Sequence, residues 1–294
     1  MTRTWLPWVA AAIAACVACG PAEEPRPVPV ERTVILGPAP LPSAISDANA
    51  PTLRAPLDTD GVTWITGLEA TADAGVAVID AGVTLDVEVD LIRVSEDAPS
   101  FTLPAGFGVS VSDALDGLPE NWRNLHVTAR ALVRDGPSTQ GGVRVTIDTV
   151  GPEGADAVAP VWRVPVTVGP AALTVESPRG DVLVATRLSD VLPAPGTIHG
   201  IVPRSAGRAR SVRVVDRGDG RVACALDRPE PGAALGAWSD PVGIAVGDGD
   251  GWWLEFELPP GEARHDVAVD LYLRTDGDVE LHYPQPDELG PAER

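Results

Sequence analysis

The feature that most constrains the fold is a period-two alternation of apolar and polar residues, which recurs from Gly61 onward. In residues 83 to 93 nearly every second residue is apolar, and the residues between them are mostly polar or acidic. Such alternation places one set of side chains in a core and the other in water, so this stretch is predicted to be one half-buried strand. One helical turn is expected over residues 112 to 118, with Ser112 as its cap and Pro119 as its stop. The chain is therefore predicted to be all-β.

The same pattern predicts further strands, separated by turn signals such as Asp135-Gly136. They cover residues 107–111, 125–133, 143–147, 162–168, 212–214, 222–226, 242–246, 252–258, 267–273 and 279–283. Short strands at this spacing predict antiparallel β-sandwiches, similar in architecture to immunoglobulin-like or fibronectin-type-III-like modules.

Turn-forming residues interrupt the alternation at residues 176 to 180, where a domain boundary is predicted. One sandwich domain would then cover residues 56–178 and a second 179–285, followed by an acidic tail over 286–294. The string from Asp86 to Leu91 reappears in similar form from Asp266 to Leu271. Either an internal duplication or chance explains this echo.

The N-terminus has the pattern of an export signal. Arg3 precedes an apolar run that is too short to cross a hydrocarbon core of about 30 Å. The string Ile13-Ala14-Ala15-Cys16 resembles the lipobox of bacterial lipoproteins. That resemblance implies cleavage before Cys16 and acylation of this cysteine, within a signal covering residues 1–19. Cys19 is the alternative lipid site, and a transmembrane anchor or a signal without lipid also remains open.

The lipobox resemblance also implies a location. Acyl chains contribute about 0.8 kcal/mol per buried methylene, so several of them would attach the protein firmly to a membrane. The expected partner is therefore a membrane, with the protein exported to the cell membrane or outer membrane and facing the periplasm or the outside. In a Gram-negative cell, Val17 after Cys16 lacks the aspartate associated with inner-membrane retention, which implies the outer membrane.

Residues 20–55 are rich in proline and alanine. Because proline fixes φ and removes a backbone donor, this segment is expected to be a disordered, extended tether outside the core. A short apolar patch between Val28 and Leu36 is the exception, and it could dock on the folded part.

The net charge, the absence of lysine and the spacing of the histidines argue against several functions. The net charge of -20 and the pI near 4.4 argue against nucleic acid as a partner, because phosphates require a basic footprint. All 22 basic residues are arginine, so a Walker A lysine and a Schiff-base lysine are impossible. The four histidines form no closely spaced zinc-binding pair. No catalytic residue is nominated, although a glycosidase that uses two carboxylates remains open.

Three local motifs have plain structural explanations. Arg217-Gly218-Asp219 resembles an integrin-binding tripeptide, but it is expected to be a hairpin turn. Cys224 is expected in the core. Asp248 and Asp250 lie in a Gly-rich loop that could bind calcium, and the Asp58–Asp60 and Asp276–Asp278 loops are similar. None has the full ligand set of an EF-type loop, so solvated turns are expected and no cofactor other than calcium is considered.

The candidate binding site is the outer face of the last three strands. If Trp252 points into the core, then Trp253 points out, and a tryptophan on a polar face is unexpected. The proposed face consists of Trp253, Glu255, Glu257, Tyr272, Arg274 and His282. It resembles a carbohydrate-binding platform in type, since aromatic rings stack on sugars and carboxylates accept their hydroxyls. Packing of Trp253 beneath a loop is the alternative.

These features together predict an exported, lipid-anchored, non-catalytic protein of the cell envelope with a binding or assembly role. An envelope protein or a glycan would be its partner. The alternative function is that of a carbohydrate-binding protein or accessory module, or of a glycoside hydrolase that uses two carboxylates. The sequence does not specify an oligomeric state.

Overall fold

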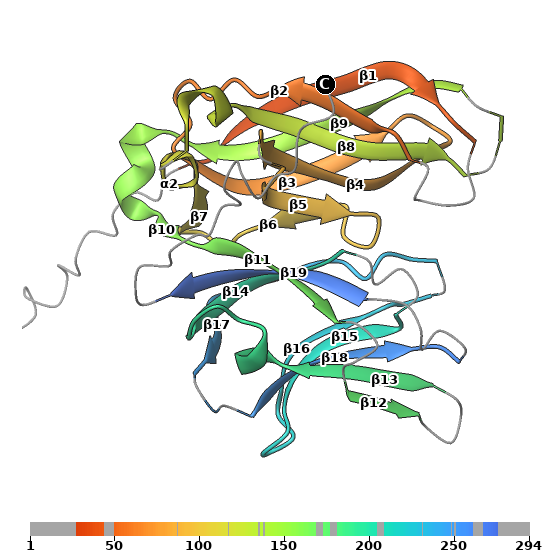
Figure 1. The fold of residues 1–294 in the computed structure, drawn as a ribbon, viewed down its shortest axis with the longest axis vertical. Coiled ribbons are helices and arrows are strands. Elements are labelled where there is room, and N and C mark those ends of the chain that lie inside the picture. The colour runs from red at the N-terminus through yellow and green to blue at the C-terminus, as the bar shows by residue number, and fades with distance from the viewer. Residues whose placement is uncertain are drawn as a thin grey trace, which may run out of the picture.

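The computed structural model describes residues 28–43, 50–86, 88–116, 118–134, 136–137, 139–168, 173–176, 181–204, 209–230, 232–247, 249, 251–260 and 267–275. Strands dominate these residues, and nearly all of them pair antiparallel (Figure 1). The predicted all-β class is confirmed, and the sheets stack as β-sandwiches. None of the described helices is long and apolar enough to cross a membrane.

The N-terminal half of the molecule is built from two sheets. Sheet I has the order β1 (Val30–Leu41), β9 (Thr139–Val150), β3 (Trp64–Ala72), β7 (Phe107–Ser110) and β10 (Ala159–Pro160), with β6 (Ser100–Thr102) also on β3. Sheet II has the order β2 (Thr52–Pro56), β8 (Leu125–Val133), β4 (Val76–Leu85) and β5 (Asp90–Ser95). Their facing side chains form one hydrophobic core.

The C-terminal half is a second pair of sheets. Sheet III has the order β11 (Trp162–Val168), β19 (Val267–Thr275), β14 (Gly196–Pro203) and β17 (Trp238–Val246). Sheet IV has the order β12 (Leu173–Glu176), β13 (Val182–Arg187), β18 (Trp252–Leu258), β15 (Ser211–Asp216) and β16 (Val222–Asp227). A separate core lies between these two sheets.

Helices are few and short among the described residues. The α-helix α2 (Val111–Leu115) is capped by Ser110, whose hydroxyl accepts a hydrogen bond from the Asp113 N–H. The helical turn was expected in this region, but the predicted cap, Ser112, is wrong by two residues. Three 3₁₀ turns complete the set, namely η2 (Glu120–Trp122), η3 (Pro152–Ala157) and η4 (Leu188–Asp190).

The single strand predicted over residues 83 to 93 is wrong. The chain turns back between β4 and β5, and the Leu85 N–H donates to the Val89 carbonyl at 2.9 Å. Glu88 occupies the left-handed region with φ 60°. This turn contains no glycine or proline, so no turn-forming residue interrupts the alternation of apolar and polar residues there, and the turn was not predicted.

The tether predicted over residues 20–55 is wrong for much of its length. β1 pairs with β9, and β2 pairs with β8. Leu36 and Leu41 are buried in the core, so the apolar patch docks as part of sheet I. The prolines fit because both strands are sheet edges, where a missing N–H is tolerated.

The boundary predicted near residue 178 does not separate the two cores. Residues 162–168 were assigned to the first sandwich, but β11 pairs with β19 in sheet III. β12 and β13, which flank residues 177 to 180, are neighbours in sheet IV. The turn formers therefore connect two strands of one sheet, and the chain passes between the halves near Val161.

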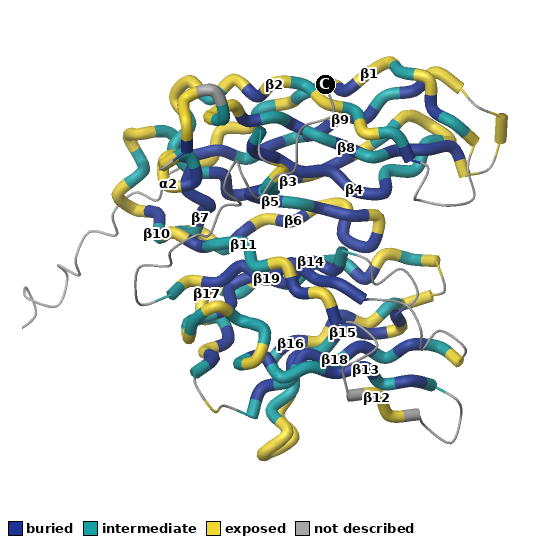
Figure 2. Tube along the Cα trace, viewed as in Figure 1, coloured by how far each residue is buried: buried dark blue, intermediate teal, exposed yellow. Residues whose placement is uncertain are grey.

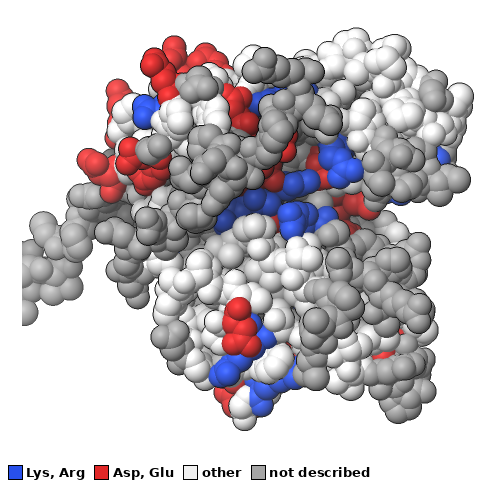
Figure 3. All heavy atoms as spheres, in the orientation of Figure 1, with Lys and Arg blue, Asp and Glu red and all other residues white. Residues whose placement is uncertain are grey.

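The two halves share a buried junction. One face of sheet III packs on sheet IV, and the other packs on β5 and β6 at the edge of the N-terminal half. β19 is consequently buried on both faces for seven consecutive residues (Figure 2). Arginine side chains gather where the halves meet (Figure 3).

Candidate functional site

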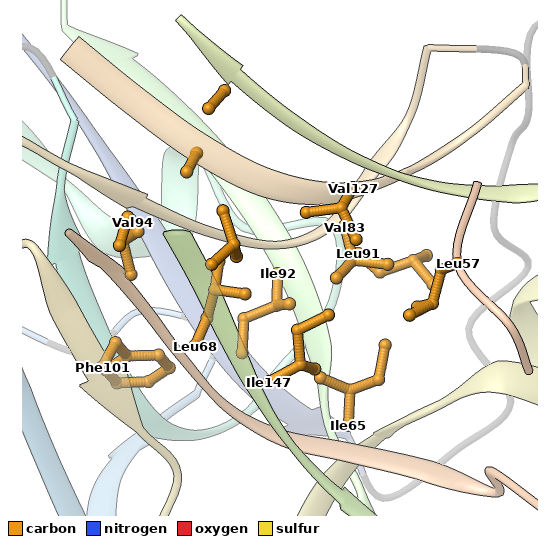
Figure 4. Close-up of a cluster of buried hydrophobic side chains, with 14 of the residues drawn as sticks. Leu57, Ile65, Leu68, Val83, Leu91, Ile92, Val94, Phe101, Val127 and Ile147 are labelled. Atoms are coloured by element: carbon orange, nitrogen blue, oxygen red, sulfur yellow. The ribbon is translucent and has the colours of Figure 1, made fainter. Parts of the chain in front are cut away.

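Aromatic side chains form the centre of the junction. Phe101 of β6 belongs to the core of the N-terminal half (Figure 4). Its ring lies 4.6 Å, centroid to centroid, from that of Tyr272 on β19. A Cβ at Gly200 of β14 would lie 2.5 Å from Phe101, so only glycine lets the ring approach this strand. The core of the N-terminal half therefore extends onto sheet III and includes Tyr272.

A network of arginine and aspartate surrounds this contact. Arg93 pairs with Asp80 at 2.8 Å and with Asp90 at 2.7 Å, all on sheet II. Arg163 of β11 crosses the junction, since its guanidinium lies 2.9 Å from Asp270 on β19 and donates to the Asp90 carbonyl at 3.1 Å. Buried charges need such partners, because an isolated one would cost several kcal/mol.

Asp270 is the most deeply buried member of the network. Its side chain is fully buried, and neither carboxylate oxygen accepts a hydrogen bond of good geometry among the described residues. Its charge is balanced by Arg163 and, at 3.8 Å, by Arg204. Asp270 is therefore held by charge rather than by a complete set of hydrogen bonds.

The pKa values follow from burial and these partners. Burial alone would lower the pKa of Arg93, but Asp90 and Asp80 more than offset it, and the pKa is raised. Burial would likewise lower the pKa of Arg163, and Asp270 and Asp90 raise it overall. Burial raises the pKa of Tyr272, whose hydroxyl accepts a hydrogen bond from the Arg93 N–H at 3.1 Å. Both guanidinium groups stay charged and the phenol stays neutral.

A second contact region extends the junction. Asp97, in the loop after β5, pairs with Arg228 at 2.6 Å, and both side chains are largely buried. The Ser95 hydroxyl donates to the Pro203 carbonyl at 2.6 Å. Nearby, His199 stacks on Phe107 with ring centroids 3.9 Å apart. Hydrogen bonds, ion pairs and ring contacts thus all connect the halves.

The outer face of sheet IV carries the second set of candidate residues, and there the predicted facing is confirmed. Along β18, Trp252 is buried together with every second residue after it, while Trp253, Glu255 and Glu257 are half-buried on the other face. Trp253 lies between Arg187 of β13 and Val215 of β15.

Arg217 covers part of this face. Its guanidinium lies 4.2 Å from the centroid of the Trp253 ring and forms an ion pair with Glu255 at 2.7 Å. One face of the indole therefore already has a cation–π partner. The arrangement leaves a mixed aromatic and charged surface on which Trp253 is held in place.

The two other described members of the predicted platform are not on this face. Tyr272 and Arg274 lie on β19, whose neighbours are β11 and β14 in sheet III. Tyr272 is fully buried in the junction, so its prediction as an exposed ligand-binding residue is wrong. Arg274 is exposed on that other sheet, and His282 lies outside the described residues. The error came from placing β19 beside β18 because they are consecutive strands of the chain.

Of the remaining motif predictions, the integrin-like tripeptide is a turn, as expected, between β15 and β16. Cys224 is buried and free, and burial raises its pKa to about 12. Asp58 and Asp60 lie in a turn closed by their own hydrogen bond. Within the described part of the chain, no group of His, Cys, Asp and Glu is arranged to hold a metal.

The other predicted sites are not among the described residues. They are the lipid sites Cys16 and Cys19 and the calcium candidates Asp248 and Asp250.

One polar cluster on sheet II was not predicted from the sequence. Asp86 accepts from Arg54 at 2.9 Å and from Asn124 at 2.8 Å, and it lies 2.6 Å from the His126 ring. Burial would raise the pKa of Asp86, but these hydrogen bonds and charges lower it overall. The cluster connects β2 to β4 and β8, which explains how the short edge strand is held.

The arginine and aspartate network of the junction was not predicted from the sequence either. One signal was present, because β19 reads Val-Ala-Val-Asp-Leu-Tyr-Leu and has few polar residues on either face. Such a run is typical of a strand covered on both sides. An aspartate within it then indicates a buried ion pair.

No family model matches the sequence, and no curated protein matches it. Among solved structures, the chain is similar to the major capsid protein P2 of bacteriophage PM2, with 12% identity and a TM-score of 0.36. The match covers 84% of this chain and 100% of that chain. A similarity at this TM-score carries no argument about what the protein does.

Proposed function

We propose that the protein is an exported, lipid-anchored, non-catalytic protein of the cell envelope with a binding or assembly role. The observation that carries the proposal is the N-terminal sequence, in which Arg3 and a short apolar run lead to Ile13-Ala14-Ala15-Cys16. We also propose that each half is a sandwich module similar to immunoglobulin-like domains in architecture, and that the two act as one body.

The fold shortens the linker between such an anchor and the folded part of the protein. β1 begins at Val30, so residues 17 to 29 would connect a lipidated Cys16 to the folded body. At full extension these residues reach at most roughly 45 Å. The tether first predicted over residues 20–55 would have reached about 110 Å at roughly 3.1 Å per residue. The proposal therefore keeps the sandwiches close to the membrane surface.

Metabolic labelling with a palmitate analogue tests the anchor. The intact protein should be labelled, Cys16→Ser should lose the label, and Cys19→Ser should keep it. Loss of label only in Cys19→Ser would move the lipid to the alternative cysteine. If the double variant is labelled as strongly as the unaltered protein, the lipoprotein proposal is wrong.

Carbohydrate binding is the second candidate function, and Trp253 is the observation that favours it. Its ring is half-buried on a polar sheet face and is fixed by Arg217, which would reduce the entropy lost on binding. A glycan array probed with the protein should show binding that Trp253→Ala abolishes and that Arg187→Ala, on the adjacent strand, alters less. Equal binding by the protein and by Trp253→Ala would remove this candidate.

A further inference from the structure

We propose that residues 276–294, which follow β19 and lie outside the described residues, cross the outer face of sheet II and are held there by ion pairs with its arginines. This inference does not depend on the lipid anchor or on carbohydrate binding. The outer face of sheet II is the side that points away from the core. It carries Arg54 of β2, Thr128 and Arg130 of β8, Asp80 and Thr84 of β4, and Arg93 of β5.

The facing of these side chains follows from the alternation along each strand. Ala81 and Val83 of β4 belong to the core, so Asp80 and Thr84 point outward. The hydroxyl oxygen of Thr84 lies 3.0 Å from that of Thr128 on the neighbouring strand. The outer face of sheet II is therefore polar, and a segment bound to it would be recognised by charge and hydrogen bonding.

Two of the outward residues are buried, although they lie on the side of sheet II opposite the core. Asp80 and Thr84 are each 8% exposed, and most of β4 is buried (Figure 2). Outside sheet II, the described strands that contact β4 and β8 most are β1, β3 and β9 of sheet I, which pack on the core side. Burial of polar residues on the opposite side favours a covering segment that is not among the described strands.

Charge favours residues 276–294 as that segment. With histidine counted as neutral, four arginines and three carboxylates give the outer face and its edge a net charge of +1, whereas the whole chain carries -20. These residues are Arg54, Arg93, Arg130 and Arg163, with Asp80, Asp86 and Asp90. Residues 276–294 contain six acidic residues and one arginine, a net charge of -5. The two charges are complementary.

β19 ends close to this face. Tyr272, three residues before the end of the strand at Thr275, pairs in register with Arg163. The Arg163 guanidinium donates to the Asp90 carbonyl on β5, at the edge of sheet II. At about 3.3 Å per residue, residue 276 therefore lies within roughly 15 Å of Arg163. The sheet measures only about 14 Å from β5 to β2, which about five extended residues can cover.

The spacing of the first acidic residues fits the sheet. Asp276, Asp278 and Glu280 alternate in the sequence, so they share one side of an extended segment and span about 13 Å. That span is close to the distance between the strands that carry Arg93 and Arg54. Because the segment is joined to β19, its effective concentration at the face is on the order of millimolar, and ion pairs that are individually weak then suffice.

The absence of lysine from the chain gives a direct test, because one introduced lysine supplies the only side-chain amine. Carbodiimide coupling joins that amine to a carboxylate in contact with it, forming an amide with loss of water. In Arg54→Lys and Arg130→Lys of the full chain in detergent, mass spectrometry should find links to acidic residues of 276–294 within the monomer. Arg213→Lys, on the outer face of sheet IV, is the matched control and should link only within that sheet.

Three results would overturn the proposal. In the first, the introduced lysines link only to Asp86 and Asp80, the present partners of Arg54 and Arg130. In the second, links to residues 276–294 occur only in cross-linked dimers, which would place the segment of a second copy on the face. In the third, the links lead to the acidic residues at positions 23 and 24 instead.

Proteolysis gives a test that does not depend on cross-linking. Arg54→Ala combined with Arg130→Ala should speed cleavage after Glu280, by a protease specific for glutamate, about tenfold. Arg213→Ala should leave the rate unchanged. It is a matched control, because the Arg213 side chain is 41% exposed and paired with an aspartate, as the Arg54 side chain is at 44%. Equal cleavage rates in the unaltered protein and the double variant would contradict the docking.

Discussion

The junction and the outer face of sheet IV use the same types of side chain in opposite surroundings. Each combines an aromatic ring, arginine and a carboxylate. In the junction the side chains of Arg163 and Asp270 are 7% and 0% exposed, while those of Arg217 and Glu255 beside Trp253 are 31% and 14% exposed. Exposed ion pairs contribute at most about 1 kcal/mol, whereas removing one partner of a buried pair costs about 3–5 kcal/mol. Burial, and not residue type, therefore separates a structural cluster from a candidate binding surface.

The largest expected effect is at the aromatic centre of the junction. Tyr272→Ala should lower the free energy of unfolding by about 3–5 kcal/mol, because it opens a cavity against Phe101 and loses the hydrogen bond from Arg93. Tyr272→Phe should cost only about 0.5–1.5 kcal/mol. Urea titration measures both values. A loss below about 1 kcal/mol for Tyr272→Ala would show that Tyr272 does not hold sheet III on the core of the N-terminal half.

The effects of substituting Arg163 and Asp270 on stability should be coupled. Arg163→Leu removes the nearest partner of the fully buried Asp270, so it should cost about 3–5 kcal/mol. Adding Asp270→Leu removes the carboxylate that has lost this partner and should recover much of the loss. The same urea titrations give the coupling energy. Additive losses in the double variant would contradict the assigned pairing.

The close approach of Phe101 to Gly200 on β14 predicts a smaller loss in the free energy of unfolding. Gly200→Ala should cost about 1–3 kcal/mol, because its Cβ would overlap Phe101. Combining it with Phe101→Leu should relieve part of the overlap. An unchanged stability for Gly200→Ala, or no relief in the double variant, would contradict the close approach to Phe101.

Trp253 should behave differently from its buried neighbour. Trp253→Ala should cost under about 1 kcal/mol, and Trp252→Ala about 3–5 kcal/mol, because only Trp252 leaves a core cavity. Thermal melting of the two variants makes the comparison. Equal destabilisation would make Trp253 a packing residue and would remove the support for carbohydrate binding.

The smallest expected effect is the pH response of His199. Burial lowers its pKa below the ordinary 6.5, while its Nδ1–H donates to the Asp240 carbonyl. Its stabilising contribution is therefore complete above pH 6.5 and is lost as pH falls through the lowered pKa. The melting temperature should fall more between about pH 7 and pH 5 in the protein than in His199→Asn, which can still donate but does not titrate in this range. Parallel pH curves would contradict a buried, neutral His199.

Local alternation predicted most individual strands and the facing of β18. This worked because alternate side chains of a strand point to opposite faces, so neighbouring residues in the sequence show which face is buried. It could not predict strand order, which depends on contacts between distant residues. Tyr272 illustrates this limit, since it alternates as an outward residue but meets Phe101, far away in the chain. The prolines of β1 led to the wrong prediction of a disordered tether for a related reason. They are compatible with a strand only because β1 is an edge of sheet I, and strand order shows this while the local sequence does not.

Differential scanning calorimetry of the purified protein tests most directly whether the junction makes the two halves one body. A shared core and a buried ion network predict one transition, with a calorimetric enthalpy equal to the van't Hoff enthalpy. Arg163→Leu should split or broaden that transition. Two separate transitions in the unaltered protein, one for each half, would contradict the account.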